Sequence, residues 1–306
     1  MSRSENMYLV IRELVKIYKW NTTAVTASPK QAVDYVKKNT ASMIVIDDTP
    51  DNPSPSVIRE IMSTPLGCTI PILCLLMDKN EHAAPAISRL GKISVAPKPI
   101  TPASFAPMFT RLVSSWESKP LFALRKVVDK VKTAPNPIKI MALERLKGIK
   151  QIESLVTRAK ALILLEEGRN KEAEKECLDI LLFNPSDLGL IITIGDIYMR
   201  SAMPEVAFKI FNSAATRFPN NVLILPDLVQ AALFSHRETE ALEFLKKQYN
   251  MEYMPEKNMT MLGRILFAEG RFDEAALVLG DNRNWYKKIE QSWRRALGQD
   301  EKKESA

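Results

Sequence analysis

The sequence predicts an α/β domain with a mostly parallel sheet, followed by an all-α superhelix of paired helices. Two observations carry this prediction. In the first 118 residues helical periods alternate with short β-branched runs, and in the second half small residues recur every 34 positions. The 306 residues then divide into an α/β domain (1–118), a basic helical connector (119–153), a repeat array (154–298) and a charged tail (299–306) that we expect to be disordered.

The repeat is the strongest pattern in the sequence. Alanines stand 34 residues apart, and glycines and prolines fall into the same phase: Ala173, Ala207, Ala241 and Ala275; Gly195 with Gly263; Gly168 with Gly270; Pro185 with Pro219. Two helices in each unit cannot bury their apolar faces alone, so units stack, and small residues stand where the helices cross. Gly168 and Gly270 are expected to end a helix in the left-handed conformation.

This pattern resembles the tetratricopeptide repeat (TPR), with units 154–187, 188–221, 222–255 and 256–289. The third unit departs most, since Val229 and Ala232 stand where glycine and tyrosine are usual. The segment Asn284–Leu297 is expected to be a capping helix. The resemblance implies protein binding in a concave groove, which would suit a peptide with acidic and apolar side chains. The groove positions it implies are Arg158, Leu162, Asp196, Met199, Arg200, Gln230, Arg264 and Phe267.

The first 118 residues are expected to place polar side chains at the carboxyl ends of parallel strands, where function gathers in such sheets. Asp47 and Asp48 follow one apolar run, and Lys98 follows another. The expected strands are Thr23–Thr26, Met43–Ile46, Ile70–Leu76 and Ile93–Ala96. The expected helices are Met7–Tyr18, Pro29–Lys38, Ser56–Ser63, Glu81–Leu90 and Pro102–Trp116.

This order resembles the receiver domain of bacterial response regulators, a flavodoxin-like fold, here with its first strand missing. The resemblance implies that Asp47 accepts phosphate and that Lys98 contacts the phosphoryl group, with Asp48 beside them. Ser2-Arg3 occupy the positions of the family's metal-binding acids. Two explanations stay open. An upstream start would restore the strand, the acids and a Mg²⁺ site, or the domain is a degenerate receiver that needs no cofactor.

The net charge of +7 is concentrated in one segment. Residues 119–150 hold nine basic and two acidic side chains, and the basic ones include Arg125, Lys126, Lys130, Lys132 and Lys139. The segment forms two expected helices, Pro120–Thr133 and Ile138–Ile152. It is either a solvated helix face or a docking surface for an acidic partner. Nucleic acid is the last choice, because no nucleic-acid motif accompanies the charge.

Several classes of function are disfavoured. No histidine pair and no glycine-rich phosphate loop occurs, so we expect no enzyme. No apolar run approaches the roughly 20 residues of a membrane span. The three cysteines stand among apolar residues, which indicates free thiols and a cytoplasmic protein. The sequence thus favours a non-catalytic adaptor of the two-component type that binds a protein partner. The alternative is a response regulator that takes phosphate at Asp47 from a histidine kinase and uses the array as its output.

Overall fold

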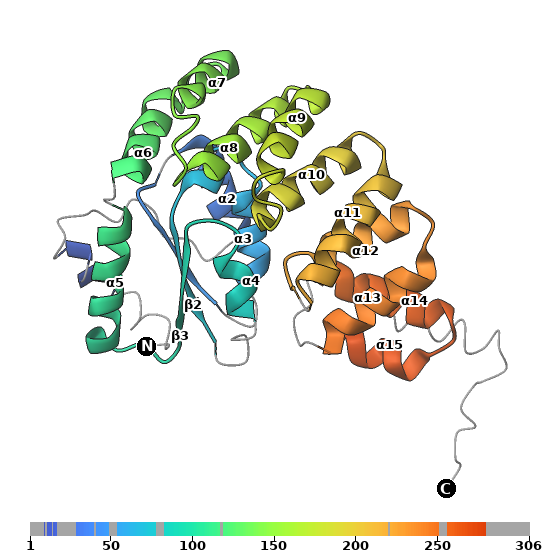
Figure 1. Cartoon of the computed structure of the whole chain (residues 1–306). Coiled ribbons are helices and arrows are strands. Elements are labelled where there is room, and N and C mark those ends of the chain that lie inside the picture. Colours follow the sequence, from blue (N-terminus) through green and yellow to red (C-terminus); the bar gives the residue numbers. More distant parts are fainter. Residues whose placement is uncertain are drawn as a thin grey trace, which may run out of the picture. The chain divides into compact units, whose positions relative to one another are not determined.

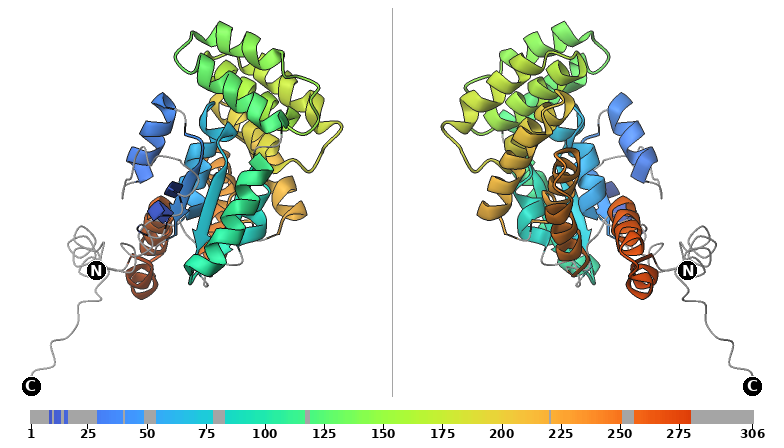
Figure 2. Two further views of the ribbon diagram at one scale, coloured as in Figure 1. Left: turned by 90° about the vertical axis from the view of Figure 1, so that its left-hand side faces the viewer. Right: turned by 90° about the vertical axis from the view of Figure 1, so that its right-hand side faces the viewer.

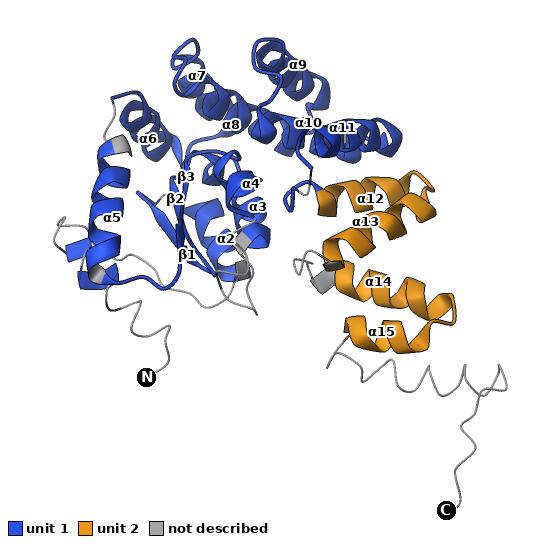
Figure 3. Ribbon diagram, turned by 60° about the horizontal axis from the view of Figure 1, so that its bottom comes forward, with its two compact units in different colours: residues 1–224 blue, residues 225–306 orange. Residues whose placement is uncertain are grey.

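The computed structural model describes residues 9, 11–13, 15–16, 29–39, 41–48, 54–77, 83–116, 119–219, 221–250 and 256–279. They form two compact units, 1–224 and 225–306 (Figure 3), and each is described by itself. The predicted domain boundaries at 118 and 153 fall inside the first unit. The predicted strand Thr23–Thr26, the capping helix Asn284–Leu297 and the tail lie outside the described residues, as does half of the predicted helix Met7–Tyr18, whose described residues are helical.

The α/β part of the first unit is built on a parallel sheet of three strands, in the order β1-β2-β3. Strands β1 (Ile44–Asp47), β2 (Ile72–Leu76) and β3 (Ile93–Pro97) pair in register, with Ile72 opposite both Ile44 and Ile93. Every residue of β2 is buried, as expected for a central strand that is covered on both faces. The three predicted strands in this region are therefore confirmed. A small parallel sheet agrees with a receiver-like fold without defining one.

Helices cover both faces of this sheet (Figure 1). Helix α5 (Pro102–Trp116) lies on one face, and α3 (Ser54–Met62) and α4 (Ala84–Ser88) lie on the other, next to α2 (Pro29–Lys38). The predicted strand Ile70–Leu76 began two residues too early. A 3₁₀ helix (Gly67–Thr69) precedes β2, and the Ile70 amide donates to the Gly67 carbonyl at 3.0 Å instead of joining the sheet.

Six helices complete the first unit and four make up the described part of the second. The first set is α6 (Lys119–Val131), α7 (Asn136–Glu144), α8 (Glu153–Glu166), α9 (Asn170–Leu181), α10 (Leu188–Arg200) and α11 (Pro204–Arg217). The second is α12 (Leu225–Phe234), α13 (Glu238–Asn250), α14 (Glu256–Ala268) and α15 (Phe272–Leu279). Within each unit successive helices pack as pairs, as the repeat predicts. The predicted helix Ile138–Ile152 ends early, and turns follow Glu144, with Gly148 in the left-handed region at φ 85°.

The small residues of the repeat stand where the helices of a pair cross. All four phased alanines are fully buried. A Cβ on Gly195 would overlap the ring of Phe211 on α11, and a Cβ on Gly263 would overlap the side chain of Leu279 on α15. The predicted reason for the 34-residue spacing, close approach of paired helices, is therefore confirmed.

The turn that ends the first helix of each pair repeats with the same spacing. One residue in each turn has a positive φ: Gly168 at 74°, Ala202 at 56°, His236 at 55° and Gly270 at 75°. The hydrogen bonds repeat too. In the first turn the amide of Arg169 donates to the Leu164 carbonyl at 2.9 Å, and that of Gly168 donates to Leu165 at 3.2 Å. This is the Schellman motif, so the predicted left-handed glycines are confirmed, and two non-glycine residues share their conformation.

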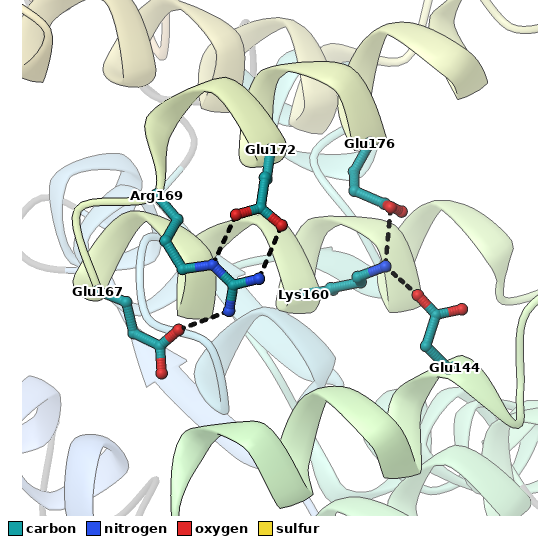
Figure 4. Close-up of polar contacts among 6 residues, drawn as sticks. All are labelled: Glu144, Lys160, Glu167, Arg169, Glu172 and Glu176. Carbon is teal, nitrogen blue, oxygen red and sulfur yellow. Dashed lines mark hydrogen bonds and ion pairs between the residues drawn. The ribbon is translucent and has the colours of Figure 1, made fainter.

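Ion pairs hold α7, α8 and α9 together (Figure 4). Lys160 on α8 contacts the carboxylates of Glu144 on α7 and Glu176 on α9, the latter at 2.7 Å. Lys147 adds a pair to Glu176 at 3.6 Å. The helix pair α6–α7 is thus tied to the first repeat through polar contacts as well as through packing.

Candidate functional site

The first candidate site lies at the carboxyl edge of the sheet. Asp47 is the last residue of β1, and Lys98 follows β3. The Lys98 ammonium forms an ion pair with the Asp47 carboxylate and donates to the Asp48 carbonyl oxygen at 2.6 Å. The structure therefore brings together the residues that the sequence placed at this edge, because both strands that carry them point the same way.

Asp48 differs from Asp47 in its surroundings. Its side chain is fully buried, and its Oδ2 accepts a hydrogen bond of 3.2 Å from the Met77 amide just after β2. Adjacent residues of an extended chain point to opposite sides, so the two carboxylates do not share one site.

A divalent cation does not fit these two carboxylates alone. Mg²⁺ is held by several oxygen ligands in near-octahedral geometry, whereas one carboxylate here is paired with Lys98 and the other faces a backbone amide. Within the described residues no group of three His, Cys, Asp or Glu side chains could hold a metal. The positions Ser2-Arg3 lie outside the described residues.

The opposite, amino edge of the sheet is held by arginines from the helices that follow. Arg125 on α6 donates to the Ala41 carbonyl ahead of β1 and lies 3.4 Å from the Thr69 hydroxyl ahead of β2. Arg158 on α8 donates to the Leu90 carbonyl ahead of β3 at 2.9 Å. Burial lowers the pKa of both guanidinium groups. Helices α6 to α9 lie beyond one end of the strands in Figures 1 and 2, and these bonds identify it as the amino end.

A second contact joins α3 to the second repeat. Nη2 of Arg59 lies 2.8 and 2.9 Å from the two carboxylate oxygens of Asp196 on α10. Gly189, also on α10, comes so close that a Cβ there would lie 3.2 Å from the Leu90 carbonyl oxygen. The first helices of repeats one and two therefore face the α/β part of the same chain.

These contacts change the picture of the predicted groove. Arg158 is only 2% exposed and Leu162 only 3%, and Asp196 is engaged by Arg59. Three of the positions that the family pattern assigns to a peptide in the first unit, Arg158, Leu162 and Asp196, are therefore buried or bonded within the protein itself. No sequence spacing would have revealed this, because Arg59 and Asp196 are 137 residues apart.

The remaining groove candidates lie in different surroundings. Arg200, Gln230 and Arg264 are exposed, and Met199 is partly exposed. Phe267 is buried, with its ring 5.2 Å from that of Phe272 in an edge-to-face arrangement. It belongs to the core of the last helix pair, which corrects its assignment to the groove.

The basic connector is partly used within the fold. Beside Arg125, Lys132 pairs with Asp129 at 3.1 Å, and Lys139 lies 3.5 Å from the Asn136 side-chain oxygen. Lys126 lies over the Phe122 ring, 4.4 Å from its centroid, and Lys130 is exposed.

Two further expectations can be compared with the described residues. Cys68, Cys74 and Cys177 are all free and buried, as predicted. None of the described helices has the length and apolar character needed to cross a membrane.

The fold defines a helical-repeat protein with an α/β part at its amino end. Comparison with known proteins adds little to this class. No protein-family model and no curated protein sequence matches the chain. Two solved structures of MamA resemble it. One is MamA 41-end from Desulfovibrio magneticus RS-1, with 12% identity and a TM-score of 0.44 over 60% of this chain and 98% of that one. The other is the MamA RS-1 ArsTM double mutant, with 12% identity and a TM-score of 0.45 over 57% and 97%.

Proposed function

We propose that this chain is a non-catalytic adaptor that binds another protein through its helical repeats. The observation that carries the proposal is the regular succession of helix pairs, fixed in phase by buried alanines and glycines. Stacked repeats of this kind create extended surfaces on which successive first helices present side chains at equivalent positions.

The surface we assign to the partner lies on α12 and α14 of the second unit. Gln230 on α12 and Arg264 on α14 are exposed at groove positions, whereas of the equivalent positions in the first unit Asp196 is bonded to Arg59 of the α/β part and Leu162 is buried. A polar amide and a cation suit a peptide segment with acidic side chains.

Site-specific photo-crosslinking of the full-length chain in the cell of origin tests this assignment. The cross-linker is placed at Gln230, at Arg264 and, as a control, at Lys247, an exposed position on the second helix of the third pair. We expect the same partner band from Gln230 and Arg264 and little from Lys247. Equal capture at Lys247, or none at the first two, would refute this surface.

A second candidate function is phosphate acceptance at Asp47, with a histidine kinase as the partner. The observation that favours it is the ion pair between Asp47 and Lys98 at the carboxyl edge. The carboxyl edge of the sheet, where this ion pair lies, is opposite the amino edge that α6 and α8 contact. The same ion pair equally suits a degenerate receiver in which lysine permanently neutralises the carboxylate.

Incubation with a small phosphodonor and Mg²⁺ separates these two readings. Labelling of the full-length chain that disappears in Asp47→Ala and persists in Asp48→Ala would establish the regulator. The adaptor proposal instead expects no acid-labile, base-labile acyl phosphate in any variant. A longer chain that begins upstream belongs in the same experiment.

A further inference from the structure

The helix pair α6–α7 carries a surface that the repeat groove does not include. On α6 the side chains of Phe122, Lys126 and Lys130 are exposed and follow one another four residues apart, so they share one face of the helix. Phe122 is 50% exposed, although an aromatic side chain gains much from burial. Lys126 sits over its ring.

Helix α7 repeats this combination of apolar and cationic groups. Ile138 and Met141 are 46% and 56% exposed, and Arg145, directly after the helix, is exposed as well. Their spacing of three and four residues places them on one side of the helix. Helix α6 thus presents one large apolar side chain followed by two cations, and α7 presents two large apolar side chains followed by one cation.

The positive charge on this surface is not neutralised within the fold. Arg125 donates a hydrogen bond to the Ala41 carbonyl, and Lys147 forms an ion pair with Glu176. Lys130 and Arg145, in contrast, form no ion pair with any residue that the structure describes. Part of the basic excess of residues 119–150, including Lys130 and Arg145, therefore lies at the surface next to exposed apolar side chains.

We propose that the α6–α7 pair binds an acidic amphipathic helix of a partner protein. The carboxylates of such a helix pair with Lys126, Lys130 and Arg145, and its apolar face covers Phe122 and Met141. A nucleic acid would satisfy the cations but would bring phosphates against Ile138 and Met141, so the mixture of groups favours protein. This surface is separate from that on α12 and α14, and the inference does not rest on it.

The test uses the full-length chain and a fluorescent designed peptide with leucine at every third or fourth position and glutamate between. A peptide of the same composition, with the leucines dispersed around the helix, measures charge alone, and a single-stranded RNA measures nucleic-acid binding. We expect the amphipathic peptide to bind about tenfold more tightly than either comparator. Phe122→Ala and Lys130→Glu should each weaken it by about tenfold. Lys209→Glu, an equal charge change at an exposed site on α11, should alter binding by less than about twofold.

Several outcomes would overturn the proposal. They are the absence of peptide binding at low salt, equal binding of the dispersed peptide, or tighter binding of RNA. Sensitivity to Gln230→Ala and Arg264→Ala without sensitivity to Phe122→Ala would move the peptide to the repeat surface and reject this one. Because the substituted side chains are exposed, circular dichroism should show unchanged folding in each variant.

Discussion

Arg59 and Asp196 join the α/β part of the first unit to its second repeat, with the guanidinium Nη2 at 2.8 and 2.9 Å from the two carboxylate oxygens. Both side chains are mostly covered, at 15% and 24% exposed. Together with the bond from Arg158 to Leu90, this contact fixes the α/β part against the first helices of repeats one and two.

Removal of this ion pair should destabilise the first unit. We expect Arg59→Ala and Asp196→Ala each to lower the free energy of unfolding by about 1–3 kcal/mol, because each leaves a partly buried charge without its partner. The double variant should cost less than the sum of the two, measured by urea denaturation as a double-mutant cycle. Strict additivity would show that the pair contributes no coupling.

The four turns with positive φ give a matched set of stability changes. A non-glycine residue in the left-handed region costs about 1–2 kcal/mol, offset in part by the greater entropy that glycine loses on folding. Ala202→Gly and His236→Gly should therefore stabilise their units by up to about 1 kcal/mol. Gly168→Ala and Gly270→Ala should destabilise by a similar amount.

The space around Gly168 and Gly270 allows the effect of backbone conformation on stability to be measured without a steric clash. A Cβ at Gly168 or Gly270 would meet no heavy atom within 4 Å, so the expected loss comes from backbone conformation and not from a clash. Thermal unfolding of the four variants measures it. Opposite signs for the two residue classes are the required result, and a loss of stability in Ala202→Gly would contradict the explanation.

The crossing of α10 and α11 supplies a third prediction. Gly195→Ala places a methyl group into the Phe211 ring, and a well-packed core does not accept added volume without a cost of about 1–3 kcal/mol. Phe211→Leu makes a cavity when it is introduced alone. In the double variant the two defects should compensate in part, as calorimetry can measure. If the losses of stability in Gly195→Ala and Phe211→Leu simply add in the double variant, the small size of Gly195 is not required to accommodate the Phe211 ring.

The sequence predicted those features that are determined by residue spacing or by strand direction. Phased small residues identified the helix pairs, because a side chain at a crossing must be small in every unit. Strand ends placed Asp47 near Lys98, because parallel strands bring their carboxyl ends to one edge. The conformation of Ala202 and His236 was hidden, since neither residue prefers it.

The docking of the repeats onto the α/β part could not be predicted for a different reason. Arg158 and Asp196 are charged residues of the kind that a peptide-binding groove presents. Their identities alone do not show whether they bind a separate peptide or another part of the same chain. The partners, Leu90 and Arg59, come from a distant part of the chain, and one of them is a backbone carbonyl that carries no side-chain signal.

Cysteine reactivity reports whether the α/β part and the repeats stay together. Burial raises the pKa of Cys68 and of Cys177 to about 12, so at pH 8 the folded protein holds almost no thiolate at either position. Iodoacetamide should therefore label these two residues in the native protein far more slowly than in urea, as mass spectrometry of the digested protein can follow.

Arg59→Ala should speed the labelling of Cys68 more than that of Cys177. Cys68 lies in the 3₁₀ helix that packs against α8, at the contact that Arg59 and Arg158 hold, whereas Cys177 lies inside the first repeat. Loss of the ion pair favours a local opening in which α8 leaves the amino edge and the repeat itself stays folded. Equal acceleration at both cysteines would instead indicate that the first unit opens as a whole.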